Sequence, residues 1–274
     1  MVQCSALTLM RTVEWIVVIY LVYVGVLAWA WPLGGRARVS VTLVAAAEAA
    51  LVLWLSAHTS PVALAARDWL PAAHILIGYR LSGPFFSAPM PRAEAWLVAS
   101  DRWWFDRGGL RWFADRGPRA ILELLELAYS SAYLMVPLGF ALVYWTATPV
   151  DADRYWTGVV AAALACYAML PWIRARTPDA LDDHVAINDR TVTMRRLNRA
   201  IQTHGSIRVA TIPSGHAAAA LATALMAGMF VPGALLPLLV LTLAIALGSV
   251  VGRYHYVVDA ILGFAVGAIA VAAT

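Results

Sequence analysis

Long apolar runs separated by short polar stretches dominate the pattern along this chain. A helix that crosses a bilayer needs about 20 apolar residues, at a rise of about 1.5 Å per residue. Seven segments fit and are predicted as membrane-spanning helices: 12–33, 39–57, 120–146, 154–173, 214–231, 234–251 and 255–273. The pattern predicts an all-α polytopic transmembrane helical bundle. The first run lacks a small-residue cleavage site before Arg36, so we expect a retained span and not a cleaved signal.

The segment 58–119 breaks this pattern, because tryptophans alternate with arginines in it and prolines interrupt it at Pro61, Pro71, Pro84, Pro89 and Pro91. Aromatic rings and basic side chains together are typical of an amphipathic segment at headgroup depth. We therefore predict an interfacial segment here, with a re-entrant hairpin around 62–81 as an alternative. The chain then divides into N-terminal spans (1–57), the interfacial segment (58–119) and C-terminal helices (120–274), all in one membrane domain.

Composition supports a membrane protein, since 62% of the 274 residues are hydrophobic and only 13% are charged. All 20 basic residues are arginines, and the net charge of +4 fits either the positive-inside bias or genomic base composition, so net charge alone decides nothing. We expect no nucleic-acid partner. Glu48, Glu123 and Glu126 fall in or at the ends of spans, where helix-to-helix hydrogen bonds or snorkelling are expected rather than catalysis. The adjacent Asp182 and Asp183 lack a ligand spacing, so we expect no metal.

A first candidate for chemistry is Pro213-Ser214-Gly215-His216, where a polar loop (174–212) turns into an apolar helix. Ser214 is a predicted N-cap, and the free N–H groups of a helix start attract anions. Gly215 allows close approach of the backbone. His216 then lies in the first turn, where it can exchange a proton near neutral pH.

A second candidate, Gly252 to Asp259, opens the last predicted span. His255 and Asp259 are four residues apart, so the carboxylate can bind one ring nitrogen and leave the other basic. Arg253 adds a fixed charge suited to phosphate. Because one helical hairpin separates the two clusters, they are expected to meet on the same side of the membrane.

These residues resemble the type-2 phosphatidic acid phosphatase superfamily, whose second motif is Pro-Ser-Gly-His and whose third ends in His-x-x-x-Asp. Ser249 stands where the third motif usually has arginine, and Arg253 resembles the substitute found in the inositol phosphorylceramide synthase-like branch. The first motif, Lys-x6-Arg-Pro, is absent, since the chain has no lysine. Arg176-Thr177-Pro178 resembles its degenerate form, and Arg174 is the competing candidate.

The resemblance implies a six-helix core in which His255 attacks phosphorus, Asp259 orients it and His216 protonates the leaving oxygen. Arg176, Ser214, Gly215 and Arg253 are implied to hold the phosphoryl oxygens, with no cofactor. The expected function is a lipid phosphate phosphatase; the alternatives are a phospholipid headgroup phosphotransferase and a non-catalytic lipid-binding protein.

The expected partners are a phosphorylated lipid and membrane lipids, in a bacterial cell membrane. The charge bias indicates a cytoplasmic site, whereas the resemblance indicates the opposite face. The sequence leaves the identity of the lipid and the oligomeric state open.

Overall fold

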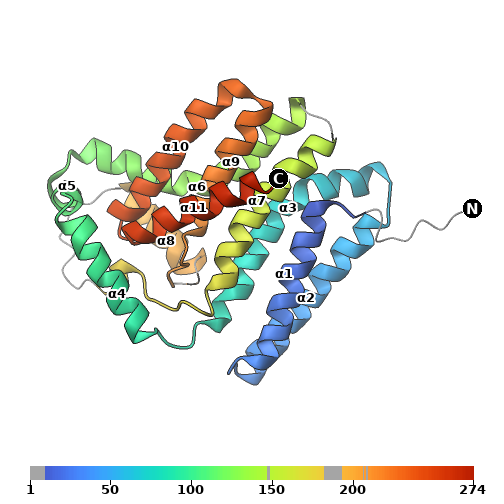
Figure 1. Cartoon of the computed structure of the whole chain (residues 1–274), viewed down its shortest axis with the longest axis horizontal. Coiled ribbons are helices and arrows are strands. Elements are labelled where there is room, and N and C mark those ends of the chain that lie inside the picture. Colours follow the sequence, from blue (N-terminus) through green and yellow to red (C-terminus); the bar gives the residue numbers. More distant parts are fainter. Residues whose placement is uncertain (1–9, 147–148, 182–192, 206, 208) are drawn as a thin grey trace, which may run out of the picture.

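In the computed structural model the described residues are 10–146, 149–181, 193–205, 207 and 209–274, which leaves Asp182 and Asp183 outside them. This part of the chain is built of helices and contains no β-strand, as predicted (Figure 1). Its only β-pairing is an isolated bridge between Ala175 and Ala210. The α-helices are α1 (Thr12–Ala30), α2 (Gly35–Ser56), α3 (Pro61–Ser82), α4 (Pro91–Asp101), α5 (Leu110–Arg116), α6 (Arg119–Thr146), α7 (Pro149–Met169), α8 (Thr193–Gly205), α9 (Gly215–Phe230), α10 (Pro232–Val251) and α11 (Val257–Ala272).

Helices occupy all seven regions predicted to cross the membrane. Among the described residues four helices, α1, α2, α6 and α10, are long and apolar enough to span a bilayer. α9 and α11 are apolar but have 16 residues each, at the short end for a span. The four long apolar helices support an integral membrane protein.

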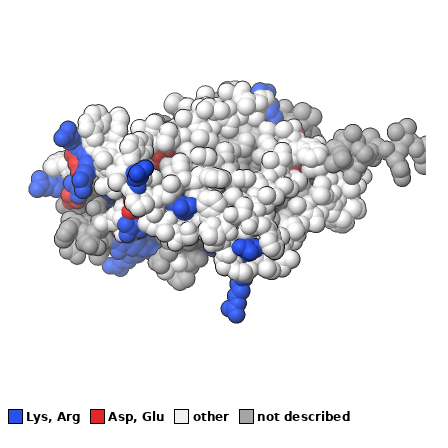
Figure 2. Space-filling model, turned by 60° about the horizontal axis from the view of Figure 1, so that its bottom comes forward, with Lys and Arg blue, Asp and Glu red and all other residues white. Residues whose placement is uncertain are grey.

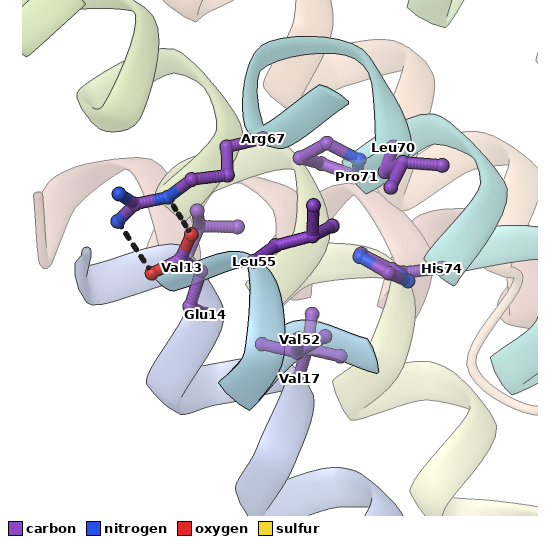
Figure 3. Close-up of a pocket in the computed structure, with 9 residues that line it drawn as sticks. All are labelled: Val13, Glu14, Val17, Val52, Leu55, Arg67, Leu70, Pro71 and His74. Atoms are coloured by element: carbon purple, nitrogen blue, oxygen red, sulfur yellow. Dashed lines mark hydrogen bonds and ion pairs between the residues drawn. The ribbon is translucent and has the colours of Figure 1, made fainter. Parts of the chain in front are cut away.

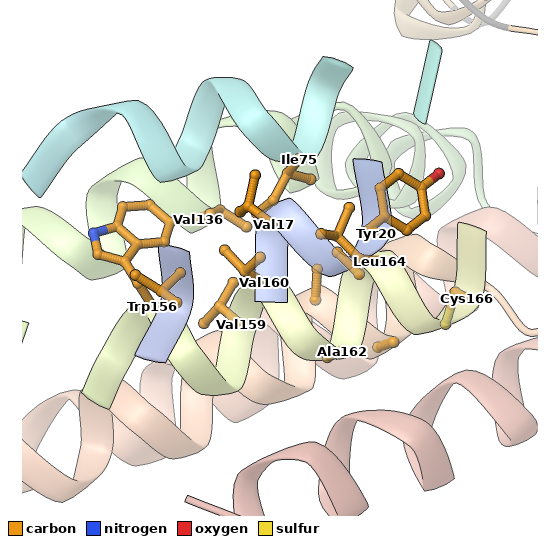
Figure 4. Close-up of a cluster of buried hydrophobic side chains, with 14 of the residues drawn as sticks. Val17, Tyr20, Ile75, Val136, Trp156, Val159, Val160, Ala162, Leu164 and Cys166 are labelled. Atoms are coloured by element: carbon orange, nitrogen blue, oxygen red, sulfur yellow. The ribbon is translucent and has the colours of Figure 1, made fainter. Parts of the chain in front are cut away.

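The helix α7 lies at the centre of the bundle, in contact with α1, α3, α6, α9 and α11. Its aromatic residues Tyr155 and Trp156 are fully buried, and they are followed by the small or β-branched side chains of Val159, Val160 and Ala163. Figure 4 shows this face of α7 meeting Val17 of α1 and Ile75 of α3. The core thus joins the N-terminal helices to those that carry the candidate motifs.

The structure differs from the prediction over the first part of the segment 58–119. Residues 61–82 form one continuous helix, α3, so the alternative of a re-entrant hairpin is wrong. Ser60 caps this helix, Pro61 stands at its start, and Pro71 is accommodated inside it. α3 packs against α1, α2 and α7, so it belongs to the bundle.

Charged and polar residues of α3 are paired inside this bundle with partners from other segments. Arg67 donates to Glu14 of α1 at 2.6 and 3.0 Å, and the pair is buried (Figure 3). Asp68 pairs with Arg11 at 2.6 Å, and His74 contacts Glu48 of α2 at 2.6 Å. Buried charges need such partners, and a single sequence does not reveal the pairing.

The rest of that segment carries α4, a π-helical stretch (Arg102–Asp106) and α5 at one end of the molecule. Figure 2 shows arginines gathered at this end. The exposed side chains there include Arg102, Trp103, Trp104, Arg107, Arg111 and Trp112. This mixture is compatible with the interfacial prediction for the part from 91 to 116, which stays a prediction, as does the three-part division of the chain.

Within the stretch predicted as a polar loop (174–212), the structure has the helix α8, which packs against α6. The carboxylate of Glu123 on α6 accepts hydrogen bonds from the backbone N–H groups of Thr193 and Met194 at 2.8 and 3.0 Å. A carboxylate at a helix start stabilises it, because it satisfies free N–H groups and opposes the helix dipole. α8 thereby begins beside α6, close to the candidate site.

Candidate active site

The start of α9 has the predicted form. Ser214 is the N-cap, and its hydroxyl accepts a hydrogen bond from the backbone N–H of Ala217. Gly215 lies against the ring of Tyr167, and a Cβ atom there would come within 2.5 Å of that ring. Glycine is therefore required for close packing at this point, beside the free N–H groups of the helix start.

The second cluster begins before its helix rather than in it. α11 starts at Val257, so His255 lies two residues upstream and Asp259 lies in the first turn. His255 Nδ1 is nevertheless 2.5 Å from Asp259 Oδ2, and both side chains are buried. The predicted His–Asp pair therefore forms, although the chain reaches it through a turn and not through an i, i+4 helix contact.

The two histidines meet. The Nε2 atom of His255 lies 3.4 Å from the Nδ1 atom of His216. Their convergence is fixed by direct contact of the two helix starts, since the backbone N–H of Ser214 donates to the carbonyl of Asp259 at 3.2 Å. Since Asp259 binds Nδ1 of His255, it favours the tautomer whose Nε2 is unprotonated and faces His216.

Arg253 is buried beside this cluster in a left-handed backbone conformation, with φ of 66°. Its guanidinium pairs with Asp101 of α4 at 2.5 Å and lies over the ring of Phe105 at 4.3 Å. The other oxygen of Asp101 accepts from the backbone N–H of Val257. Asp101 therefore ties both Arg253 and the start of α11 to α4.

Arg176 is half-exposed and its guanidinium binds Glu94 of α4, with a shortest distance of 2.7 Å. This hydrogen-bonded ion pair lowers the pKa of Glu94 and raises that of Arg176. The carbonyl of Arg176 accepts from the hydroxyl of Tyr256, next to His255. Its backbone thus borders the site, while Glu94 holds its side chain through Nε and one terminal nitrogen.

The competing candidate, Arg174, points elsewhere. Its guanidinium donates to the carbonyls of Ala88 and Pro171 and lies over the ring of Trp31. It therefore joins the loop after α7 to the N-terminal helices.

Sequence reasoning missed a buried hydrogen-bond network behind the histidines. One carboxylate oxygen of Glu126 accepts from both Asn198 of α8 and the hydroxyl of Tyr254, at 2.8 Å each. Arg195 of α8 lies 3.7 Å from Glu126 and donates to the carbonyl of Gly252. The expected helix-to-helix bonding of Glu126 is confirmed, and a second acidic residue, Glu48, bonds to His74.

This network reaches both histidines. The ring of Tyr254, next to His255 in the chain, stacks on Tyr129 at 4.4 Å, and Tyr129 lies 5.3 Å from the ring of His216. The signal for the network in the sequence is the spacing of Arg195 and Asn198, which are three apart and so share one face of α8. Both are buried.

A cavity of about 340 Å³ opens beside His216, between α3, α6, α7 and α9. Its walls are mostly apolar, with aromatic residues Trp69, Tyr79, Tyr133 and Tyr167. His216 and Gly215 line one part of it. Across the described residues, no group of three or more histidine, cysteine or acidic side chains is arranged to hold a metal ion.

The candidate site lies within a region that matches a family model. The model, described as the PAP2 superfamily, covers residues 94–273, which run from the first turn of α4 to the end of α11. Neither a curated protein nor a solved structure matches the chain.

Proposed function

Because this chain belongs to the PAP2 superfamily, which supports a phosphatase-type function, we propose that it hydrolyses a lipid phosphate through a phosphohistidine on His255. The observation that carries the proposal is the position of His255, with Asp259 on one ring nitrogen and His216 facing the other. A nucleophile oriented by a third group and facing an acid is the arrangement that group transfer requires.

In the first step, Nε2 of His255 attacks phosphorus and the bond from phosphorus to the lipid oxygen breaks. His216 gives a proton to that oxygen, so a lipid alcohol leaves. The imidazole of His255 then carries the phosphoryl group and a positive charge, which the buried carboxylate of Asp259 balances.

In the second step, His216 removes a proton from water, and the water oxygen attacks the same phosphorus. The bond from phosphorus to Nε2 breaks and inorganic phosphate leaves, so His216 and His255 return to their starting protonation states. A single histidine serves as acid and then as base, as microscopic reversibility requires.

The charge on the phosphoryl oxygens needs stabilisation, and several groups lie close enough to the histidines to contribute. Ser214 and Gly215 supply the start of α9, where free N–H groups point outward. Arg253 supplies fixed positive charge that Asp101 holds beside His255. Arg176 joins them if a substrate phosphate displaces Glu94. These groups supply nucleophile, acid and charge without a metal ion.

The test is phosphate release by the purified full-length protein in detergent, with a panel of lipid phosphates and a chelator present. Wild type is expected to release phosphate, and His255→Ala is expected to lose at least about 10³-fold in rate, as removal of a nucleophile does. His58→Ala, at an exposed histidine after α2, is the matched control and retains activity.

A second readout identifies the intermediate. A labelled phosphoryl group on the wild-type protein should be stable in alkali and lost in acid, because the phosphorus–nitrogen bond of phosphohistidine is acid-labile. No phosphate release by wild type on any lipid of the panel would overturn the proposal, and so would full activity of His255→Ala.

A further inference from the structure

The cavity beside His216 has the character of a chain-binding site rather than a headgroup site. Alanines from three helices leave the space open, and larger side chains bound it. The alanines are Ala72 and Ala73 of α3, Ala132 of α6 and Ala219 of α9. Apolar walls with few polar groups favour an apolar ligand, because a headgroup there would lose its hydration without gaining partners.

The position of the cavity relative to the histidines follows the requirements of the reaction. Attack on phosphorus by His255 expels the oxygen on the opposite side, since entering and leaving groups lie roughly in line. The acid must be within hydrogen-bond reach of that oxygen. His216 both faces His255 and lines the cavity, so the leaving alcohol is expected on the cavity side.

The cavity also reaches the outer surface of the bundle between α3 and α6. Three of its lining side chains are partly exposed there: Leu76 is 55% exposed, Tyr133 40% and Trp69 38%. This surface is apolar, and for a membrane protein it faces lipid. An alkyl chain can therefore enter sideways from the bilayer, and it needs no aqueous path.

The size of the cavity limits what it holds. Its volume of about 340 Å³ is at the small end of ligand pockets, which range over about 300–1,000 Å³. We take a volume at this small end to favour one extended apolar chain over two. α3 lies outside the family match of residues 94–273, so this wall is supplied by the chain's own N-terminal part.

We infer that this cavity binds the apolar chain of the leaving alcohol and that the substrate is a lipid phosphate with a single apolar chain. The inference rests on the proposed function, which supplies the leaving alcohol. On this inference α3 selects the lipid, and the residues at the starts of α9 and α11 carry out the chemistry.

The experiment compares single-chain phosphates of increasing length, octyl, dodecyl and hexadecyl phosphate, with a two-chain phosphatidic acid in the same detergent. The second-order rate constant kcat/KM is measured for wild type, Ala73→Phe and Ala65→Phe. Ala65 is on the same helix but exposed, so it is the matched control. The chainless ester p-nitrophenyl phosphate reports the chemistry alone.

We expect wild type to prefer the longer single chains over both octyl phosphate and the two-chain lipid. Ala73→Phe, which fills the cavity, should lower the ratio of kcat/KM for hexadecyl to octyl phosphate by about tenfold or more, an amount typical of a few lost methylene contacts. Ala65→Phe should keep the wild-type ratio.

The outcomes distinguish a failure of the chain-binding inference from a failure of the proposed function. If wild type hydrolyses p-nitrophenyl phosphate but shows no dependence on chain length, or prefers the two-chain lipid, the chain-binding inference is wrong and the proposed function stands. If Ala73→Phe folds and keeps the wild-type ratio, the inference is also wrong. If wild type hydrolyses none of these esters, the proposed function itself fails. Should Ala73→Phe not fold, the wild-type length series still decides.

Discussion

The helices α9 and α11, whose starts bring the two histidines together, touch at glycines of α11, and we expect this contact to set the distance between the histidines. A Cβ atom at Gly263 of α11 would lie 2.6 Å from the carbonyl oxygen of Ser214 and 3.0 Å from Cβ of Ala217. Gly267, one turn further along α11, meets the carbonyl of Ala218 in the same way. Glycines spaced by four residues allow close helix contact in membranes.

We predict that Gly263→Ala separates the start of α9 from α11. The new Cβ atom would lie about 0.8 Å closer to the carbonyl oxygen of Ser214 than the 3.4 Å at which ordinary van der Waals contact begins. This oxygen belongs to the backbone, so it cannot rotate away as a side chain can. Displacement of about 1 Å at a catalytic centre costs about 10²-fold in rate. We therefore expect a loss of 10- to 100-fold (about 1–3 kcal/mol in the barrier).

The effect on stability should be smaller than the effect on rate. Overpacking costs about 1–3 kcal/mol, but alanine is a better helix former than glycine by about 1 kcal/mol. The two terms partly cancel, so the variant should fold and lose only a few degrees in its unfolding midpoint.

The assay is phosphate release from an alkyl phosphate together with thermal unfolding in detergent. Gly25→Ala is the control, because nothing lies within 4 Å of a Cβ atom at Gly25. It should keep full activity and unfold at the same or a slightly higher temperature. Wild-type activity of a folded Gly263→Ala variant would refute the reasoning, since it would mean that the separation of α9 and α11 does not control the chemistry.

Two further predictions concern the contacts around the site. Glu126→Ala removes the carboxylate that Tyr254 and Asn198 share. Asn198 keeps its hydrogen bond to the backbone carbonyl of residue 126, so the cost of about 1–3 kcal/mol falls on the buried hydroxyl of Tyr254. We expect kcat to fall more than KM changes and Glu126→Gln to restore part of the rate; an unchanged kcat in a folded variant would contradict this. Because the pair with Arg176 lowers the pKa of Glu94, it stabilises the fold at pH values above 4.5, the ordinary pKa of glutamate, and ceases to do so as pH falls through the lowered pKa. The thermal unfolding midpoint of wild type should therefore fall toward that of Glu94→Gln in acid. A constant difference between the two midpoints at all pH values would count against this prediction.

Much of this fold could be predicted because its causes are local. Long apolar runs predict helices, and the helices stand where those runs do. The N-cap at Ser214 was predictable because a hydroxyl before an apolar run satisfies a free N–H group at the helix start. The pairing of His255 with Asp259 was predictable because four residues of separation keep two side chains within reach, whether in a helix or in a turn leading into one.

Contacts between distant segments could not be predicted in the same way. The segment 58–119 was predicted as interfacial from its prolines and from tryptophans that alternate with arginines. The sequence did not show that Arg67, Asp68 and His74 have partners in other segments, namely Glu14, Arg11 and Glu48. A charged residue in a single sequence has the same appearance whether it faces water, headgroups or a buried partner. Only the fold decides between these, and here it buries α3 against α1, α2 and α7.

The ion-pair partners of the two site arginines could not be predicted from the sequence either. Arg176 and Arg253 were both selected as phosphate ligands by their place beside the motifs, and the structure gives each a carboxylate of α4, Glu94 and Asp101. The two pairs differ in burial, since the side chain of Arg176 is 47% exposed and that of Arg253 only 7%. An exposed pair is weak and exchanges readily, whereas breaking a buried pair is costly. Under the proposed function, we therefore expect Arg176 to leave Glu94 for an arriving phosphate and Arg253 to keep Asp101. The helix α4 would then hold one arginine in place through Asp101 and compete with the substrate for the other through Glu94.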